Sequence, residues 1–284
     1  TGAWLVTGGL GGLALRGASM LSLYGSTQFI LSSRSGHEVR AGQGLTEHLH
    51  GIAETAVVAA CNSSDLVESQ ALQMTCAFAS GVLHAAGIVS DKLLVRMEGS
   101  AFQAVYAPKI LAATNLHGCN TKVAMEVMVL YSSSAATFGN RGQANYCAAN
   151  ASLDSHAFGR RKHGLVGSSL QPSNVSGLGM AAHANELGMH ADAWSLGLEQ
   201  YAVSLSRVLS REGIVHVPLP YTIIYMGGSR LLESVADAKK CQAKSVSACN
   251  EDELPNATPV TALATGSALA VSYTHLRAHE TGSY

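Results

Sequence analysis

Four side chains that together could reduce a carbonyl group occur in three neighbouring segments. Tyr146 and Asn150 are four residues apart in a stretch with a helical pattern, so both project from one face. Ser133 ends a buried strand pattern, and Lys109 lies in the preceding helical stretch. A tyrosine, whose ordinary pKa is about 10, donates a proton to a developing alkoxide well only if its phenolate is stabilised. An ammonium can provide that stabilisation, a serine hydroxyl can hold the carbonyl oxygen, and an amide can anchor a water that returns the proton.

A glycine cluster lies where such chemistry would need a cofactor. The segment TGGLGGLA follows an apolar strand pattern and opens a helical one. Glycines permit a tight turn and let backbone N–H groups approach a pyrophosphate, which the helix N-terminus also attracts. A flexible turn is the simpler interpretation, but the strand–turn–helix setting favours a dinucleotide cradle. Its candidate contacts are Thr7, Gly8, Gly9, Leu10, Gly11, Gly12 and Leu13.

The end of the second strand pattern indicates which dinucleotide would bind. NAD sites place a carboxylate here for the ribose 2′-hydroxyl, whereas this sequence has Arg34 between Ser33 and Ser35. A guanidinium flanked by hydroxyls suits a 2′-phosphate, so we expect NADPH as the cofactor.

Strand and helix patterns alternate along the chain. This alternation predicts an α/β fold: a Rossmann-like, doubly wound parallel sheet with helices on both faces. Ligands of such sheets bind at the carboxyl ends of the strands. The expected strands are Ala3–Val6, Gln28–Ser33, Ala56–Cys61, Gly81–His84, Val123–Ser132, Leu165–Leu170 and Val215–Leu219, and the expected helices are Leu13–Leu23, Leu66–Phe78, Ser100–Leu116, Tyr146–Arg161 and Leu198–Leu209.

Composition excludes several other classes of protein. Hydrophobic residues make up 47% and charged residues 13% of the 284 residues, and the net charge of −1 gives no basic field for a nucleic acid. No apolar run reaches the length of about 20 residues that a membrane span needs. The six cysteines form no CxxC pair and the histidines show no metal-ligand spacing, which favours a reducing compartment such as the cytoplasm, or an organelle such as a plastid, and no metal site.

The sequence predicts one domain followed by unstructured chain. Residues 1–228 carry the strand and helix patterns of the catalytic, NADPH-binding domain. Residues 229–270, rich in Ala, Ser, Thr and Asn, are interpreted as a linker. Residues 271–284 (VSYTHLRAHETGSY) fit neither and are interpreted as a non-native tail. The chain opens without Met directly before a strand, as a fragment of a longer protein would.

The motifs resemble those of one family. TGGLGGLA, SRSG, HAAG at His84–Gly87, APK, YSSS at Tyr131–Ser134 and GQANYCAAN at Gly142–Asn150 resemble the ketoreductase domains of polyketide synthases and animal-type fatty-acid synthases, within the short-chain dehydrogenase/reductase superfamily. The resemblance covers about Thr1–Pro220. Most of the superfamily has the lysine four residues after the tyrosine; here Asn150 is there and the lysine is upstream, as in synthase ketoreductases.

The resemblance implies a role for each site residue. Tyr146 would be the acid, Ser133 the carbonyl-orienting donor, and Lys109 and Asn150 the supporting pair. Asn62, in place of the family's aspartate, would contact adenine. Further cofactor contacts would come from Ser63, Ala85, Ala86 and Gly87.

Substrate contacts are implied by the same resemblance. The Leu-Asp-Asp motif of B-type domains keeps only Asp91, and Phe138 replaces the tryptophan of A-type domains, which favours the B-type product. GLGMAA resembles the substrate lid, although the usual Trp-Gly before it is absent. The candidate substrate contacts are Asp91, Ser134, Phe138, Gln143 and Met180.

The expected activity is NADPH-dependent reduction of a 3-oxoacyl thioester carried on the phosphopantetheine of an acyl carrier protein, beside other domains of one synthase polypeptide. Two alternatives remain: a non-catalytic ketoreductase retained as a scaffold or cofactor-binding module, and a free-standing short-chain dehydrogenase. The retained tyrosine, serine and lysine count against the first, and the lysine position counts against the second.

Overall fold

A computed structural model of the chain describes residues 2–37, 45–76, 79–120, 125–175, 196–209 and 222–225. These residues form a seven-stranded parallel sheet with the strand order β3-β2-β1-β4-β5-β6-β7. The order runs outward in both directions from the β1/β4 pair, so the fold is the predicted doubly wound α/β fold. The strands are β1 (Ala3–Thr7), β2 (Gln28–Ser33), β3 (Ala56–Ala60), β4 (Ala79–His84), β5 (Val127–Tyr131), β6 (Ser168–Pro172) and β7 (Thr222–Tyr225).

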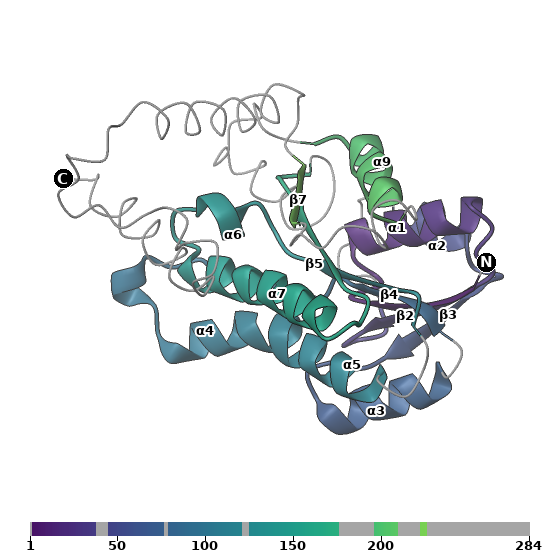
Figure 1. Ribbon diagram of the computed structural model, residues 1–284, viewed down its shortest axis with the longest axis horizontal. Helices are drawn as coiled ribbons and strands as arrows, with labels where there is room; N and C mark the ends of the chain where they lie inside the picture. The colour runs from purple at the N-terminus through teal and green to yellow at the C-terminus, as the bar shows by residue number, and fades with distance from the viewer. Residues whose placement is uncertain are drawn as a thin grey trace, which may run out of the picture.

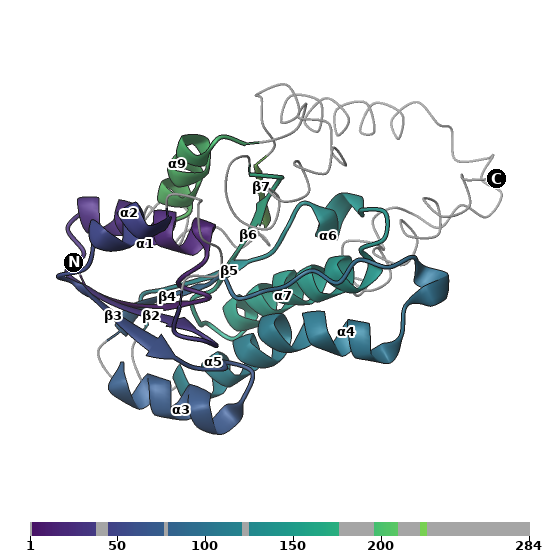
Figure 2. The same cartoon turned by 180° about the vertical axis from the view of Figure 1, so that it is seen from behind.

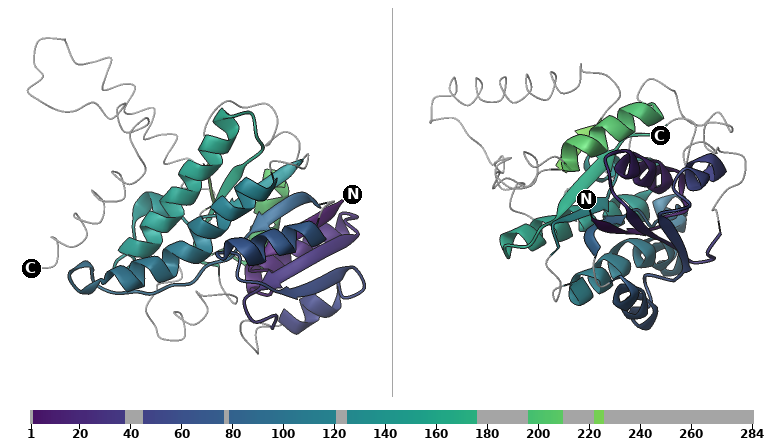
Figure 3. Two further views of the ribbon diagram at one scale, coloured as in Figure 1. Left: turned by 90° about the horizontal axis from the view of Figure 1, so that it is seen from below. Right: turned by 90° about the vertical axis from the view of Figure 1, so that its right-hand side faces the viewer.

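Helices cover both faces of this sheet. The helices α1, α2 and α9 lie on one face, and α3, α4, α5 and α7 lie on the other (Figures 1 and 2). In the right-hand view of Figure 3, the green α9 and the purple α1 lie on one side of the sheet and the teal helices lie on the other. The helices are α1 (Gly12–Leu23), α2 (Leu45–His50), α3 (Leu66–Thr75), η1 (Leu94–Arg96), α4 (Gly99–Tyr106), the π-helical η2 (Ala107–Leu111), α5 (Ala112–Asn120), α6 (Ala135–Phe138), α7 (Ala144–Lys162) and α9 (Leu198–Leu209).

Alternate residues of the central strands face two separate cores. Trp4 of β1 packs in the cluster under α1 and α9, whereas Leu5 packs in the cluster under α3, α5 and α7. In β5, Tyr131 belongs to the first cluster and Leu130 to the second. This alternation follows from the two-residue period of a strand, and burial on both faces explains the continuous apolar runs.

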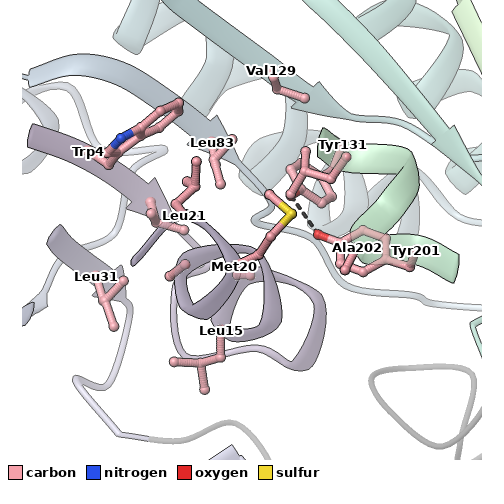
Figure 4. Packing of buried hydrophobic residues seen from close by; sticks show 14 of the residues in the cluster. Trp4, Leu15, Met20, Leu21, Leu31, Leu83, Val129, Tyr131, Tyr201 and Ala202 are labelled. Carbon is pink, nitrogen blue, oxygen red and sulfur yellow. Dashed lines mark hydrogen bonds between the residues drawn. The ribbon is translucent and has the colours of Figure 1, made fainter. Parts of the chain in front are cut away.

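Helix α1 approaches α9 closely, and this explains a glycine that looks costly in the sequence. A Cβ at Gly17 would lie 3.0 Å from Leu205 Cδ2 and 3.3 Å from the hydroxyls of Tyr131 and Tyr201. Those hydroxyls are hydrogen-bonded at 2.7 Å (Figure 4). The Tyr201 hydroxyl also donates to the Leu13 carbonyl at 2.8 Å. Gly17 therefore makes room for a buried hydrogen-bonded pair between α1, β5 and α9.

Most predicted elements are present, with some differences. The helix expected over Ser100–Leu116 is α4, η2 and α5 in succession. The π turn coincides with Pro108, which has no N–H for an α-helical bond. The strand expected at Leu165–Leu170 is shifted to Ser168–Pro172, because the Leu165 amide donates to the Arg160 carbonyl of α7 at 2.9 Å and the Val166 carbonyl accepts from Arg160 Nε at 2.8 Å. The sequence patterns did not predict α2, η1, α6 or β7.

Several predictions lie outside the described residues. These are the strand at Val215–Leu219, the lid segment with Met180, the linker at 229–270 and the tail at 271–284.

Candidate active site

The carboxyl ends of β1 and β4 meet where the strand order reverses, which is where doubly wound sheets bind ligands. Thr7 ends β1 and His84 ends β4, and the Thr7 hydroxyl lies 2.6 Å from His84 Nδ1. Both side chains are fully buried. This hydrogen bond joins the start of the predicted cofactor cradle to the strand that leads into HAAG.

The cradle turn is fixed by close packing of the backbone. Gly8 has φ +67°, and a Cβ there would lie 2.7 Å from the backbone of Ala86. A Cβ at Gly9 would lie 2.6 Å from the Val6 carbonyl oxygen and 2.9 Å from Leu31 Cα. Both glycines are therefore required by the protein's own packing, in addition to any ligand.

The cradle leads directly into α1. Its N-cap residue is Gly11, so no side chain caps the helix, and the amide N–H groups of the first turn remain available to an anion. Leu10 is buried in the core, so it can contribute only its backbone to a ligand. An uncapped helix start behind a glycine turn fits a pyrophosphate.

The segment expected to hold the ribose and adenine lies beside this turn. Ser32 of β2 pairs with Thr7 of β1, and the Gly9 amide donates to the Ser32 carbonyl at 2.8 Å. Arg34, the second residue after Ser32, is exposed, so its guanidinium is free to meet a phosphate. The neighbouring Ser33 hydroxyl accepts a hydrogen bond from the Gly36 amide at 3.1 Å. The residues at the end of β2 therefore fit a phosphorylated ribose.

Asn62 and Ser63 follow β3, the next strand along the sheet. The Asn62 Oδ1 accepts a hydrogen bond from the Ser64 hydroxyl at 2.7 Å, and the Ser63 carbonyl accepts one from Asn115 Nδ2 at 3.1 Å. These contacts fix the loop at the β2/β3 side of the sheet. Adenine recognition by Asn62 stays a prediction.

Lys109 is buried and its amine points at the other predicted residues. The side chain is 3% exposed, and Nζ donates to the Tyr131 carbonyl at 2.9 Å. The same Nζ lies 5.2 Å from the centre of the Tyr146 ring. Gly87 makes room for this side chain, because a Cβ there would lie 3.1 Å from Lys109 Cε. The last residue of HAAG thus contacts the lysine.

Tyr146, Ser133 and Asn150 complete the group. Burial raises the pKa of the Tyr146 phenol, and its interactions with the Asn150 and Ser133 side chains oppose that rise. Asn150 Nδ2 donates to the Tyr146 carbonyl at 2.8 Å, while its buried Oδ1 has no partner among the described residues. The four predicted side chains therefore converge at the carboxyl end of β5.

The electrostatics differ in one respect from the expectation. We expected the ammonium to stabilise the phenolate, which would lower the pKa of Tyr146. Desolvation instead raises this pKa, and the effects that oppose the rise come from the Asn150 and Ser133 side chains. Burial also lowers the pKa of Lys109 to about 8, although the negative charge of Asp154 opposes this decrease. The phenol is thus kept protonated, as a proton donor requires.

The described substrate candidates come from the loop after β4, from α6 and from the start of α7. Gln143 Nε2 donates to Asp91 at 2.9 Å, and Asp91 is exposed. Ser134 is the N-cap residue of α6, and Phe138 is its last residue and is 38% exposed. The Asp91 and Gln143 side chains are therefore hydrogen-bonded to each other, and their contact with a substrate stays a prediction.

Two further residues at the site were not predicted: His84, which is fully buried, and Asp154, which is half-buried. His84 Nε2 lies 2.8 Å from the Lys109 carbonyl, which can only accept, so Nε2 carries the proton and Nδ1 accepts from Thr7. Asp154 follows Asn150 by four residues on α7 and accepts hydrogen bonds from Ser169 and Gln171. The four-residue spacing from Tyr146 through Asn150 could have revealed Asp154. No local pattern marks His84 as a partner of the lysine.

Among the residues that the structure describes, no helix is long and apolar enough to cross a membrane, and no group of three or more His, Cys, Asp or Glu side chains could hold a metal ion.

Comparison with known proteins agrees with this geometry. The family model described as "KR domain" matches residues 2–177. The chain is 36% identical over 178 residues to polyketide synthase GfsA of Streptomyces halstedii, covering 60% of the chain and 2% of the relative. It is 32% identical over 193 residues to erythronolide synthase EryA2 of Saccharopolyspora erythraea, covering 66% and 5%. The chain thus spans only a small part of these relatives.

Solved structures resemble it as well. A structure described as an A1-type ketoreductase superposes with a TM-score of 0.67 at 29% identity, covering 73% of this chain and 45% of that one. The first ketoreductase of the tylosin polyketide synthase gives 0.65 at 31% identity, covering 74% and 47%.

The fold and the site define a nicotinamide-dependent oxidoreductase of the short-chain dehydrogenase/reductase superfamily. Within that superfamily, the chain belongs to the KR domain family, the ketoreductase domains of polyketide synthases.

Proposed function

We propose that this domain reduces a 3-oxoacyl thioester, carried on the phosphopantetheine of an acyl carrier protein, to the 3-hydroxyacyl thioester, with NADPH as the reductant. The observation that carries the proposal is the convergence of Lys109 Nζ on the Tyr146 ring, 5.2 Å from its centre, beside Ser133 and Asn150. The relatives are large synthases, which supports a carrier protein and neighbouring synthase domains as partners.

Each side chain has a defined task in this proposal. The bound dinucleotide supplies the hydride. Ser133 holds the carbonyl oxygen, and Tyr146 donates its proton to the oxygen as negative charge develops there. Lys109, as an ammonium, stabilises that charge, and the unpaired Oδ1 of Asn150 anchors the water that returns the proton.

Turnover of an acyl-cysteamine thioester with NADPH tests the activity. We expect turnover by the wild type and a loss of about 10²–10⁴-fold in Tyr146→Phe with cofactor binding retained. The control is Tyr24→Phe, at an exposed tyrosine beyond α1, which should keep wild-type turnover. Cofactor binding without wild-type turnover would instead indicate the non-catalytic module, and preference for a free small ketone would indicate a free-standing dehydrogenase. Chiral chromatography of the product tests the expected B-type configuration.

The choice of cofactor has a separate test. Arg34→Ala should weaken NADPH binding about 10–100-fold, because a charge-assisted contact contributes about 1.5–3 kcal/mol, and should change NADH binding little. Lys162→Ala, at an exposed cation at the end of α7, is the matched control. Equal losses for both dinucleotides in Arg34→Ala would contradict the assignment.

A further inference from the structure

A half-buried carboxylate shares the face of α7 that carries the proposed catalytic residues. Tyr146, Asn150 and Asp154 follow one another at intervals of four residues, so they form one row along the helix. Tyr146 and Asn150 have tasks in the proposed reaction, and Asp154 does not touch the reacting atoms in it. A carboxylate in such a place needs compensation for the loss of water.

Strand β6 supplies part of that compensation. Gln171 Nε2 donates to Asp154 Oδ2 at 2.7 Å, and the Ser169 hydroxyl donates to Oδ1. The far end of the Gln171 amide is also fixed, because Thr137 donates to its Oε1 at 2.8 Å. Asp154 therefore has a fixed orientation between α7 and β6.

The remaining compensation comes from Lys109. The Lys109 ammonium donates to the neutral Tyr131 carbonyl, and a buried ammonium needs a counter-charge to stay protonated. Tyr131, whose carbonyl accepts from Lys109, pairs with Leu170 of β6, and the residues on either side of Leu170 are Ser169 and Gln171, which hold the Asp154 carboxylate. The Asp154 carboxylate and the Lys109 ammonium therefore lie at the same end of two neighbouring strands, and the charge of each acts on the other. The other titratable groups that face Lys109 are the Tyr146 phenol from α7 and the His84 ring from β4, both neutral near pH 7.

We infer that Asp154 is a positioning residue: its carboxylate, held by Ser169 and Gln171, is the counter-charge that keeps Lys109 an ammonium beside Tyr146. This inference rests on the proposed function, because it assigns the ammonium a task there. The directions of the two pKa values agree with it: burial raises that of Asp154 to about 6, and the charge of Lys109 opposes the rise.

The decisive variant is Asp154→Asn, which removes the charge and keeps the shape. Its new amide N–H would face Gln171 Nε2, but the Gln171 amide can turn over, because the Thr137 hydroxyl can accept as well as donate. The hydrogen bonds are thus restored and only the charge is lost. Glu126→Gln is the matched control, since it removes one carboxylate at an exposed position before β5, at the end of that strand opposite to the site.

The direct measurement is the pH titration of the Lys109 Cε resonance in the 284-residue chain labelled with ¹³C-lysine, assigned with Lys109→Met. In Asp154→Asn the pKa of Lys109 should fall by about one unit or more from its value of about 8, and in Glu126→Gln it should stay. The wild-type resonance should also show a second inflection near pH 6 as Asp154 takes up a proton. An unchanged Lys109 titration in Asp154→Asn overturns the inference. If that variant fails to fold, the absence of the second inflection in the wild type overturns it instead.

Kinetics separate this inference from the proposed function. Activity that needs the ammonium is lost as the pH rises through the pKa of Lys109, so the alkaline limb of kcat should move to lower pH in Asp154→Asn by the same shift, with KM little changed. A wild type that turns over the thioester, with the same alkaline limb in Asp154→Asn, would refute the role of Asp154 and leave the proposed function intact. A wild type without turnover refutes the proposed function, while the resonance titration still tests the charge pair.

Discussion

The buried histidine at the end of β4 should make folding stability depend on pH. Burial lowers the pKa of the His84 imidazole from 6.5 to about 4, since its protonated form would lose water and its Nδ1 acceptor role toward Thr7. The unfolded chain therefore takes up a proton at higher pH than the folded chain does. The stabilisation is complete above about pH 6.5 and is lost as the pH falls toward 4. From about pH 7.5 to about pH 5, linkage gives a loss of about 2 kcal/mol from this residue.

The perturbation is His84→Gln, because glutamine keeps an N–H donor for the Lys109 carbonyl and does not titrate. Urea unfolding at the two pH values gives the difference in the free energy of unfolding for each protein. That difference should be about 2 kcal/mol smaller in His84→Gln than in the wild type, even if the variant is less stable at both pH values.

A second histidine also contributes to the pH dependence of stability, so the experiment needs a control variant. His156 also has a pKa lowered to about 4 by burial, so the wild type keeps part of its pH dependence when His84 is replaced. The control is His50→Gln, at an exposed histidine that ends α2, and it should keep the wild-type difference. The reasoning is refuted if His84→Gln and the wild type lose equal stability between the two pH values.

Three further predictions concern stability alone. Gly17→Ala and Gly159→Ala both replace a helical glycine, but only the Cβ at Gly17 meets neighbours within 4 Å. Gly159→Ala should therefore raise the free energy of unfolding by up to about 1 kcal/mol, and Gly17→Ala should lower it; equal effects would contradict the packing argument. Tyr201→Phe should lower it by about 1–3 kcal/mol, because the Leu13 carbonyl loses a buried donor; a neutral change would mean that this hydrogen bond contributes nothing. Asp65→Ala should lower it by about 1 kcal/mol, because the Asp65 carboxylate accepts the Glu68 amide at the start of α3, and Asp65→Asn, which also caps, should cost less.

Local patterns were sufficient for the central strands and for α1, α7 and α9. The apolar runs of β1 and β2 and the helical period of Leu198–Leu209 identify those elements to within a residue or two. Short elements were missed because α6 has four residues and β7 has four, too few for a period to show. The start of β6 at Ser168 could not be predicted, because Leu165 and Val166 are hydrogen-bonded to Arg160 of α7, and a local apolar pattern does not show such contacts.

Some features of the candidate site were likewise predictable from local patterns, and others were not. Tyr146 and Asn150 were predictable from one helix, and the glycines of the cradle from one turn. The sequence could not show that the Lys109 carbonyl is held by His84, or that Gly87 makes room for the lysine side chain, because those contacts join segments about 25 residues apart. The raised pKa of Tyr146 was also not predictable, since desolvation depends on everything packed around the ring.

The position of Lys109 in η2 has a consequence for how the site is lost. In a helix that carries tyrosine and lysine together, the helical repeat alone would keep the two groups neighbours. Here the amine reaches the phenol only because η2 packs directly against α7 on one face of the sheet. A loosened state that keeps its helices but not its side-chain packing would therefore already be inactive. On gentle denaturation, the catalytic constellation should disappear before the far-ultraviolet circular dichroism changes.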